Sequence, residues 1–267
     1  MPPKSKLGQN FLNDESAIER IAASVGEVST HTVVEIGPGL GAITKRLAIR
    51  AGKLIAVEYD HQLALRLRVH FGNSGDAHVK VVEQDVLAFD FAAAAAEAGE
   101  KLSVVGNLPY YITSPILLRL AECHASLKQA VLMVQREVAD RVTAQPGTRD
   151  YGVLSVSVQM FGPVERLFTL PPEAFTPPPE VHSTVFRWHF APRFEELGVT
   201  EAPFLHLVKI AFAQKRKTLS NNLRAAGVAA DTITQALAAA GIDPHARAET
   251  LPLESFAALA RALPLPT

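Results

Sequence analysis

Three alternate glycines mark the stretch Glu35-Ile36-Gly37-Pro38-Gly39-Leu40-Gly41. The stretch follows an apolar run at 32–36 and precedes a helical pattern at 42–50, so the glycines stand at a strand-to-helix turn. Glycine permits a tight turn and a close approach of the backbone to a ligand. The spacing is one residue shorter than the dinucleotide fingerprint, and the absence of a following Lys-Ser/Thr pair excludes a phosphate-binding P-loop. A glycine turn of this kind also occurs for structural reasons, so by itself it does not establish a ligand-binding site.

Short apolar runs alternate with helical patterns over the first two-thirds of the chain. Near-continuous apolar strands that alternate with helices are typical of a mostly parallel sheet covered on both faces. A proline-rich loop, instead of a helix, precedes the last strand, which can therefore insert antiparallel. We predict an α/β, Rossmann-like fold with a seven-stranded, mostly parallel sheet whose last strand is antiparallel. Strands are predicted at 32–36, 53–57, 78–82, 102–106, 129–134, 154–161 and 183–190, and helices at 42–50, 60–70, 91–97 and 114–124.

The character of the chain changes after Pro192. Residues 193–202 have the composition of a linker, and beyond them apolar residues recur only at helical spacing, as at Phe204, Leu207 and Val208. We therefore predict two domains, a Rossmann-like domain at 1–192 and a small helical domain at 193–267.

The composition of the chain limits its partners. Hydrophobic residues make up 48% and charged residues 20%, which is globular, and the net charge of −1 gives no general support for nucleic-acid binding. RNA binding must therefore rest on a local patch, and the acid-free segment 202–230 supplies the candidates, although a solvated helical face would look the same. These candidate RNA-binding residues are Lys209, Lys215, Arg216, Lys217 and Arg224.

The single cysteine, Cys123, excludes an internal disulfide and fits a reducing cytosol. The histidines show no metal-ligand spacing, and no apolar stretch is long enough to cross a bilayer. We expect a cytoplasmic protein, a monomer, without a metal and without a membrane partner.

Acidic side chains end the second and third predicted strands. Glu58 precedes Tyr59 at one strand end, and Asp85 precedes Val86 at the other. A carboxylate at the first position can accept both hydroxyls of a ribose, and one at the second can accept from the amino group of an adenine. Each acid alone is usually solvated or a helix cap. Together with Gly37 and Gly39, they suit S-adenosylmethionine, which carries an adenosine but no phosphates.

The tetrapeptide Asn107-Leu108-Pro109-Tyr110 follows the fourth predicted strand. It offers two acceptors, the side-chain oxygen of Asn107 and the backbone carbonyl of Leu108, beside the flat ring of Tyr110. Pro109 holds Leu108 extended and removes a competing N–H donor. Such a site can bind a planar ring that carries an exocyclic amine, although a strand-ending turn would have the same composition.

These motifs together resemble the S-adenosylmethionine-dependent RNA adenine-N6 methyltransferases. Residues 6–12 and 175–183 are similar to two motifs of the ribosomal RNA adenine dimethyltransferases, and 212–219 with 241–249 are similar to the second domain of the bacterial small-subunit enzymes. The resemblance covers nearly the whole chain, although Glu180 and His182 stand where relatives often have Lys and Asp. It implies a catalytic set of Asn107, Leu108, Tyr110 and Phe175, with Phe175 stacked on the target adenine. It implies a cofactor set of Gln9, Asn10, Leu12, Gly37, Gly39, Glu58, Tyr59, Asp85, Val86 and Asn107.

The resulting hypothesis is dimethylation of the N6 amines of two adjacent adenosines in the 3′-terminal hairpin loop of 16S ribosomal RNA, during small-subunit biogenesis. The alternatives are a large-subunit ribosomal RNA methyltransferase and a non-catalytic ribosome-assembly or RNA-binding factor. A DNA adenine methyltransferase is disfavoured because that group usually shows Asp-Pro-Pro-Tyr. A dehydrogenase is disfavoured by the shortened glycine turn.

Overall fold

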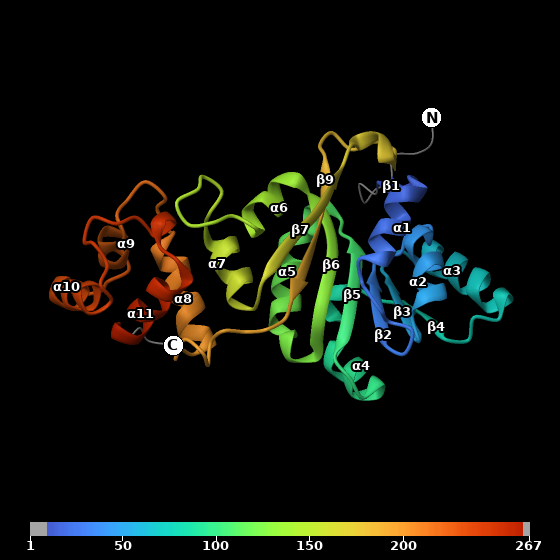
Figure 1. Ribbon diagram of the computed structural model, residues 1–267, viewed down its shortest axis with the longest axis horizontal. Coiled ribbons are helices and arrows are strands. Elements are labelled where there is room, and N and C mark those ends of the chain that lie inside the picture. The colour runs from blue at the N-terminus through green and yellow to red at the C-terminus, as the bar shows by residue number, and fades with distance from the viewer. Residues whose placement is uncertain (1–9, 264–267) are drawn as a thin grey trace. The chain divides into compact units, whose positions relative to one another are not determined.

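The computed structural model describes residues 10–263 and divides into two compact units (Figure 1). The first unit contains the residues up to 139 together with 165–190, and the second contains 140–164 and the residues from 191 onward. The predicted boundary between 192 and 193 stays a prediction. The segment 140–164, which precedes it, groups with the second unit.

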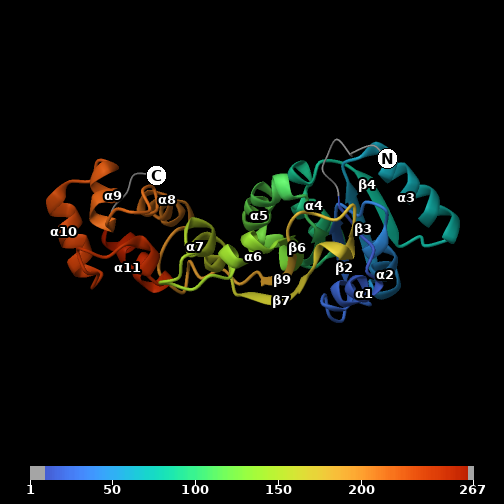
Figure 2. The same cartoon turned by 90° about the horizontal axis from the view of Figure 1, so that it is seen from above.

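A seven-stranded sheet forms the centre of the first unit, in the order β4-β3-β2-β5-β6-β9-β7 (Figures 1 and 2). The pairs β2–β3, β3–β4, β2–β5 and β5–β6 are parallel, and β9 pairs antiparallel with β6. The predicted fold class is therefore confirmed. The strands are β2 (Thr32–Ile36), β3 (Lys53–Glu58), β4 (Val79–Glu83), β5 (Leu102–Asn107), β6 (Leu127–Gln135), β7 (Val164–Leu170) and β9 (Ser183–His189).

The strand order places a topological switch point between β2 and β5. From β2 the chain adds β3 and β4 on one side, and then crosses to add β5 and β6 on the other. In open α/β sheets, ligands bind outside the carboxyl ends of the strands at such a point. The predicted glycine turn and the tetrapeptide at 107–110 follow these two neighbouring strands.

Helices connect the strands and supply one side of the core. Buried side chains of α1 and α2, such as Ile18, Ile21 and Leu47, cluster with Val33 of β2 and Val105 of β5. In chain order, the first six helices among the described residues are α1 (Glu15–Ala23), α2 (Ala42–Arg50), α3 (His61–Ser74), α4 (Phe91–Ala98), α5 (Thr113–Glu122) and α6 (Arg136–Val142).

The strand predicted at 154–161 is wrong, because this segment is helix α7 (Val153–Met160). Its alternation of apolar residues with Ser155, Ser157 and Gln159 imitates a half-buried strand. Ser155 is buried in the helix, where its hydroxyl donates to the carbonyl of Arg141 and accepts from Gly152 N at 3.0 Å. The strand that completes the sheet is β7, which was not predicted because it mixes apolar residues with Glu165 and Arg166.

The second unit has its own core. Phe204, Leu207 and Val208, the residues predicted from helical spacing, are buried in it together with Tyr151 and Phe256. Its helices are α7, α8 (Glu201–Ala211), α9 (Leu219–Ala225), α10 (Ala230–Ala239) and α11 (Leu253–Ala262). Across residues 10–263, no helix has the length and apolar character that crossing a bilayer requires.

Candidate active site

A cavity of about 360 Å³ lies at the carboxyl ends of β2, β3 and β5 and beside the residues that follow β4. It sits at the switch point of the sheet. The structure brings most of the predicted site residues together in its lining. These are Asn10, Leu12, Gly37, Gly39, Glu58, Tyr59, Asp85, Val86, Asn107, Leu108 and Tyr110. Gln9, also predicted, lies outside the described residues.

The glycine turn forms one wall of the cavity. Gly39 has a φ of 57°, in the left-handed region that other residues adopt at a cost, and its amide donates to Glu58 Oε2 at 2.9 Å. A Cβ at this position would lie 3.2 Å from the ring of Phe11, which also lines the cavity. Both the backbone conformation and the packing of Phe11 therefore favour glycine at residue 39.

The carboxylate of Glu58 is fixed by the backbone around it. The side chain is 3% exposed; Oε2 accepts from Gly39 N and Oε1 accepts from Asp60 N at 2.9 Å. Each carboxylate oxygen accepts about two hydrogen bonds, so capacity remains for ligand hydroxyls. The glycine turn and the acid, which are about twenty residues apart in sequence, thus form one hydrogen-bonded structure.

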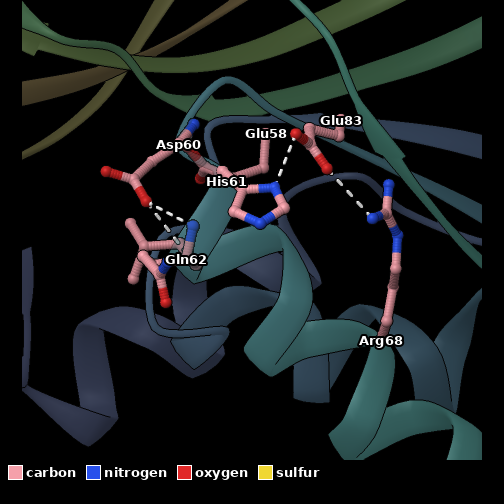
Figure 3. A network of polar contacts seen from close by, with 7 residues as sticks. Glu58, Asp60, His61, Gln62, Arg68 and Glu83 are labelled. Carbon is pink, nitrogen blue, oxygen red and sulfur yellow. Dashed lines mark hydrogen bonds and ion pairs between the residues drawn. The ribbon is translucent and has the colours of Figure 1, made fainter.

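A polar network holds the loop that follows β3 (Figure 3). Asp60 caps α3 by accepting from two amides of its first turn, and His61 Nδ1 lies 2.8 Å from an oxygen of Glu83. Arg68 donates to the other oxygen of Glu83 at 3.0 Å. Hydrogen bonds from His61 and Arg68 lower the pKa of Glu83. The loop that carries Tyr59, an exposed side chain at the cavity, is therefore tied to the end of β4.

Asp85 follows β4 and begins a short 3-10 helix. Its Oδ1 accepts from Leu87 N at 2.9 Å, so one function of the carboxylate is a cap. Its side chain is exposed and lines the cavity, and the following Val86, which is buried, lines the cavity as well. Capping and ligand binding use different lone pairs, so the two interpretations of Asp85 do not exclude each other.

The tetrapeptide at 107–110 is pinned from two sides. Asn107 Nδ2 donates to the carbonyl of Asn10 at 3.2 Å, and Leu108 N donates to Met133 O of β6 at 3.0 Å. The first bond orients the Asn107 amide, since its nitrogen faces a carbonyl. Within residues 10–263, Asn107 Oδ1 and the carbonyl of Leu108 accept no hydrogen bond. The two predicted acceptors are thus free in residues that line the cavity.

Tyr110 is half-buried at the same wall. Its hydroxyl lies 2.8 Å from Ser183 Oγ, at the start of β9. Burial raises the pKa of Tyr110, and the contact with Ser183 opposes that shift only in part. The ring is therefore neutral at physiological pH and available for stacking rather than for proton abstraction.

Phe175 is not among the side chains that line the cavity. It is 3% exposed and packs in the core of the first unit with Leu12, Ile18 and Val185. It lies in β8 (Phe175–Thr176), which pairs antiparallel with β1 (Phe11–Leu12), so Phe175 stands opposite Leu12. In this conformation its ring has no free face for a base, and its predicted stacking role stays a prediction.

Glu35 received no role from the sequence, although it begins the glycine stretch. It is the next-to-last residue of β2, is 2% exposed and lines the cavity. Its Oε2 has no hydrogen-bond partner among the described residues. Burial raises the pKa of Glu35 to about 8; the nearby Thr44 hydroxyl lowers it and the charge of Glu58 raises it. The sequence did carry a signal for it, since an acid inside an otherwise apolar strand, two residues before a glycine turn, is unusual.

The five predicted RNA-binding cations are all exposed in the second unit: Lys209, Lys215, Arg216, Lys217 and Arg224. Lys215 donates to the carbonyl of Arg149 at 2.9 Å, which adds a sixth exposed cation to the same region of that unit. No cluster of three or more His, Cys, Asp or Glu side chains suited to a metal occurs in the described part of the chain.

The sequence is similar to known proteins over nearly its full length. The family model for "Ribosomal RNA adenine dimethylase" matches residues 3–264. A protein of Acidobacterium capsulatum named ribosomal RNA small subunit methyltransferase A is 55% identical over 260 residues, covering 97% of this chain and 91% of that protein.

Two solved structures share the fold. A dimethyladenosine transferase from Plasmodium falciparum superposes with a TM-score of 0.78 at 23% identity, covering 93% of this chain and 95% of that one. The 23S rRNA methyltransferase ErmE superposes with a TM-score of 0.71 at 26% identity, covering 95% of this chain and 99% of that one.

Proposed function

The chain belongs to the ribosomal RNA adenine dimethylase family, and we propose that it dimethylates the N6 amines of two adjacent adenosines in the 3′-terminal hairpin loop of 16S ribosomal RNA. The observation that carries this proposal is the pair of free acceptors at Asn107 and Leu108, beside the Tyr110 ring and in the wall of the glycine-lined cavity. Transfer of a methyl group to an adenine amine requires acceptors for the amine that lie beside the cavity for the methyl donor.

The cavity fits S-adenosylmethionine. When bound, this cofactor supplies an electrophilic methyl group. Gly37 and Gly39 leave room for it, Glu58 has spare acceptor capacity for ribose hydroxyls, and Asp85 with Val86 and Tyr59 would hold the adenine. The unpartnered buried oxygen of Glu35 would bind a polar group of the cofactor, since a carboxyl kept neutral by burial can donate or accept a hydrogen bond. Asn10 and Leu12 also line the cavity.

The acceptors act on the nucleophile. The lone pair of an adenine N6 amine is delocalised into the ring, which makes the amine a weak nucleophile. Asn107 Oδ1 and the Leu108 carbonyl bind its two hydrogens, favour a pyramidal nitrogen and aim its lone pair at the donor side of the cavity. Good orientation of reactants can supply roughly 7–11 kcal/mol of a barrier, and stabilisation of the growing positive charge adds to it.

Tyr110 holds the extruded base by stacking. A base that stacks on an aromatic side chain gains about 1–3 kcal/mol, which offsets part of a cost of a few kcal/mol for leaving its own stack. Phe175 would provide a second face only after its ring leaves the core. A monomethylated amine retains one hydrogen for an acceptor, so the same site can accept the product for a second transfer.

Small-subunit RNA is the proposed substrate because the relatives at 49–55% identity carry that name, whereas the 23S enzyme is 26% identical. The exposed cations from Lys209 to Arg224 would bind RNA phosphates. We place the protein in the cytoplasm, as a monomer acting on the small subunit or its precursor. A non-catalytic assembly factor is the weaker candidate, because it would have no need for free acceptors beside a cofactor cavity.

The deciding experiment uses purified protein, labelled S-adenosylmethionine, and separate small and large subunits that lack the modification. We expect label on two adjacent adenosines of small-subunit RNA and none on the large subunit. Label on large-subunit RNA alone would assign the chain to the alternative substrate. Cofactor binding without label on either subunit would favour the non-catalytic role.

A further inference from the structure

Ser183 belongs to the motif at 175–183 that the sequence singled out, yet the proposed function gives it no role. It is the first residue of β9 and is 0% exposed. Its position is set by the strand ladder, where Ser183 stands opposite Gln135 of β6, and by the preceding bond from Arg136 N to His182 O at 2.9 Å. The Ser183 hydroxyl is therefore a fixed point behind the wall of the cavity.

Among the described residues, the only hydrogen bond of this hydroxyl is to Tyr110, whose hydroxyl lies 2.8 Å from Ser183 Oγ. Tyr110 itself stands in a short 3-10 turn, η2 (Tyr110–Ile112), and lines the cavity, whereas Ser183 does not. A tyrosine ring turns about two side-chain torsions, and a hydrogen bond at the far end of the ring, from a fixed atom, restricts both.

We propose that Ser183 is a positioning residue that fixes the plane of the Tyr110 ring for stacking on the target adenine. This inference rests on the proposed function and deepens it. The ring orientation is set before RNA arrives, so the base enters a prepared surface and the amine meets the acceptors of Asn107 and Leu108 in a productive orientation. Ser183 acts only through the Tyr110 hydroxyl and touches neither RNA nor cofactor.

The neighbouring Thr184 provides a matched control. It is also 0% exposed, and its hydroxyl makes a bond of similar length, 2.9 Å, to Thr169 Oγ1. Because side chains alternate along a strand, Thr184 points to the opposite face of β9 from Ser183. Thr184→Val removes a buried hydroxyl from the same strand without touching Tyr110.

The test is a double-mutant cycle of Ser183→Ala and Tyr110→Phe, measured as kcat and KM for small subunits with saturating cofactor. Each single variant should lower kcat/KM by about 2- to 13-fold, the range that corresponds to one neutral hydrogen bond. Because both remove the same contact, the double variant should be no worse than either single one. The affinity for S-adenosylhomocysteine should stay unchanged, and Thr184→Val should keep wild-type kcat/KM.

Independent, multiplying losses in the two single variants would overturn the positioning role, as would an equal loss in Thr184→Val. Thermal unfolding of every variant separates a folding defect from a loss of positioning, and Ser183→Thr, which keeps the hydroxyl, should restore activity if it folds. Absence of transfer by the wild-type protein would instead overturn the proposed function, so the two failures are distinguishable.

Discussion

Asn107 combines two tasks in one side chain. Its amide nitrogen donates to the carbonyl of Asn10, and its oxygen is left free in the wall of the cavity. A carboxylate at this position would have no donor for Asn10, and an aliphatic side chain would have neither group. The identity of residue 107 is therefore set by its contact with the N-terminal segment as well as by the proposed acceptor role.

Replacing Asn107 by Ala should nearly abolish methyl transfer. Loss of one preorganised group that stabilises developing charge typically costs about 100- to 1000-fold in kcat. The bond to Asn10 is lost as well, but the glycine turn and Glu58 remain, so cofactor affinity should change little. Single-turnover assays with labelled cofactor and calorimetric cofactor binding measure the two effects. A variant that turns over like the wild-type protein would remove Asn107 from the mechanism.

Replacing Glu35 by Gln should change how stability depends on pH. The folded-state pKa is raised to about 8, so burial favours the neutral carboxyl. The stability that this group contributes is fully present below its unfolded pKa and is lost as pH rises through about 8. The free energy of unfolding of the ligand-free variant, relative to that of the wild-type protein, should therefore rise by up to about a few kcal/mol from pH 5 to pH 9. Denaturant unfolding across that range tests the sign.

Glu83→Gln is the control for this measurement. Hydrogen bonds from His61 and Arg68 lower the pKa of Glu83, so its contribution to stability is present at neutral pH and lost on acidification. The control variant should therefore lose stability at neutral pH and approach the wild-type protein in acid. A Glu35→Gln profile parallel to the wild-type one would mean that Glu35 is ionised in the fold.

At the scale of elements, the cavity is built from loops that are tied to one another. The bond from Gly39 to Glu58 joins the glycine turn after β2 to the end of β3. The network of His61, Arg68 and Glu83 joins helix α3 to the end of β4. The ribbon of β1 and β8 connects residues of the cavity wall to the segment that carries Phe175. A movement of β8 that exposes Phe175 would therefore also act on the residues of β1, Phe11 and Leu12, at the cavity.

The basic segment of the second unit is held in a similar way. Asn222, which is 3% exposed in α9, donates to the carbonyls of Ala211 and Gln214 at 2.6 and 3.3 Å. Leu219 N donates to Ala246 O at 2.8 Å. Both ends of the segment 212–218 are thus fixed, and its cations are presented from a defined turn.

Replacing Asn222 by Leu should loosen that turn. Two carbonyls lose their donor, and leaving buried polar groups unpaired costs about 1–3 kcal/mol. RNA affinity should fall because the cations lose their common orientation, while cofactor affinity stays the same. Denaturant unfolding and RNA-binding titrations measure both effects. Gln235→Leu, at an exposed position of α10, is the matched control and should leave both quantities nearly unchanged.

At the scale of the whole molecule, a net charge of −1 leaves RNA binding to local charge. The described exposed cations at 209–224 are concentrated in a segment without acids. Binding through such a patch releases counterions from the RNA, and this makes affinity fall with salt.

Changing Lys215, Arg216 and Lys217 together to Gln should weaken RNA binding and lower the slope of log affinity against log salt by about 2–3, if each cation meets one phosphate. Cofactor affinity should be preserved, since the three residues lie in the second unit and the cavity lies in the first. An unchanged slope would show that the RNA-binding surface lies elsewhere. Lys45→Gln, at an exposed position of α2 in the first unit, is the charge control and should leave the salt slope unchanged.

The predictable parts of the fold were those where local and tertiary preferences agree. Helix α2 was predicted with its observed bounds. Strands β2, β3, β5 and β6 were placed within a few residues, because buried parallel strands are largely apolar. Helix α7 was misread because its alternating serines imitate a strand, and only the buried bonds of Ser155 make that polar residue acceptable in a helix core. The two-residue strands β1 and β8 carry no periodicity at all, since their pairing is a long-range contact.

The sequence by itself determined which chemical groups are present: the glycine turn, the strand-end acids, the amine acceptors and the cations. Their order along parallel strands also determined that most of them meet, because carboxyl ends of parallel strands share one edge of a sheet. Tertiary structure alone decided the orientation of the Asn107 amide, the support of Tyr110 by Ser183, the burial of Phe175 and the raised pKa of Glu35. These depend on contacts between residues far apart in the chain and on exclusion of water, which no local pattern encodes.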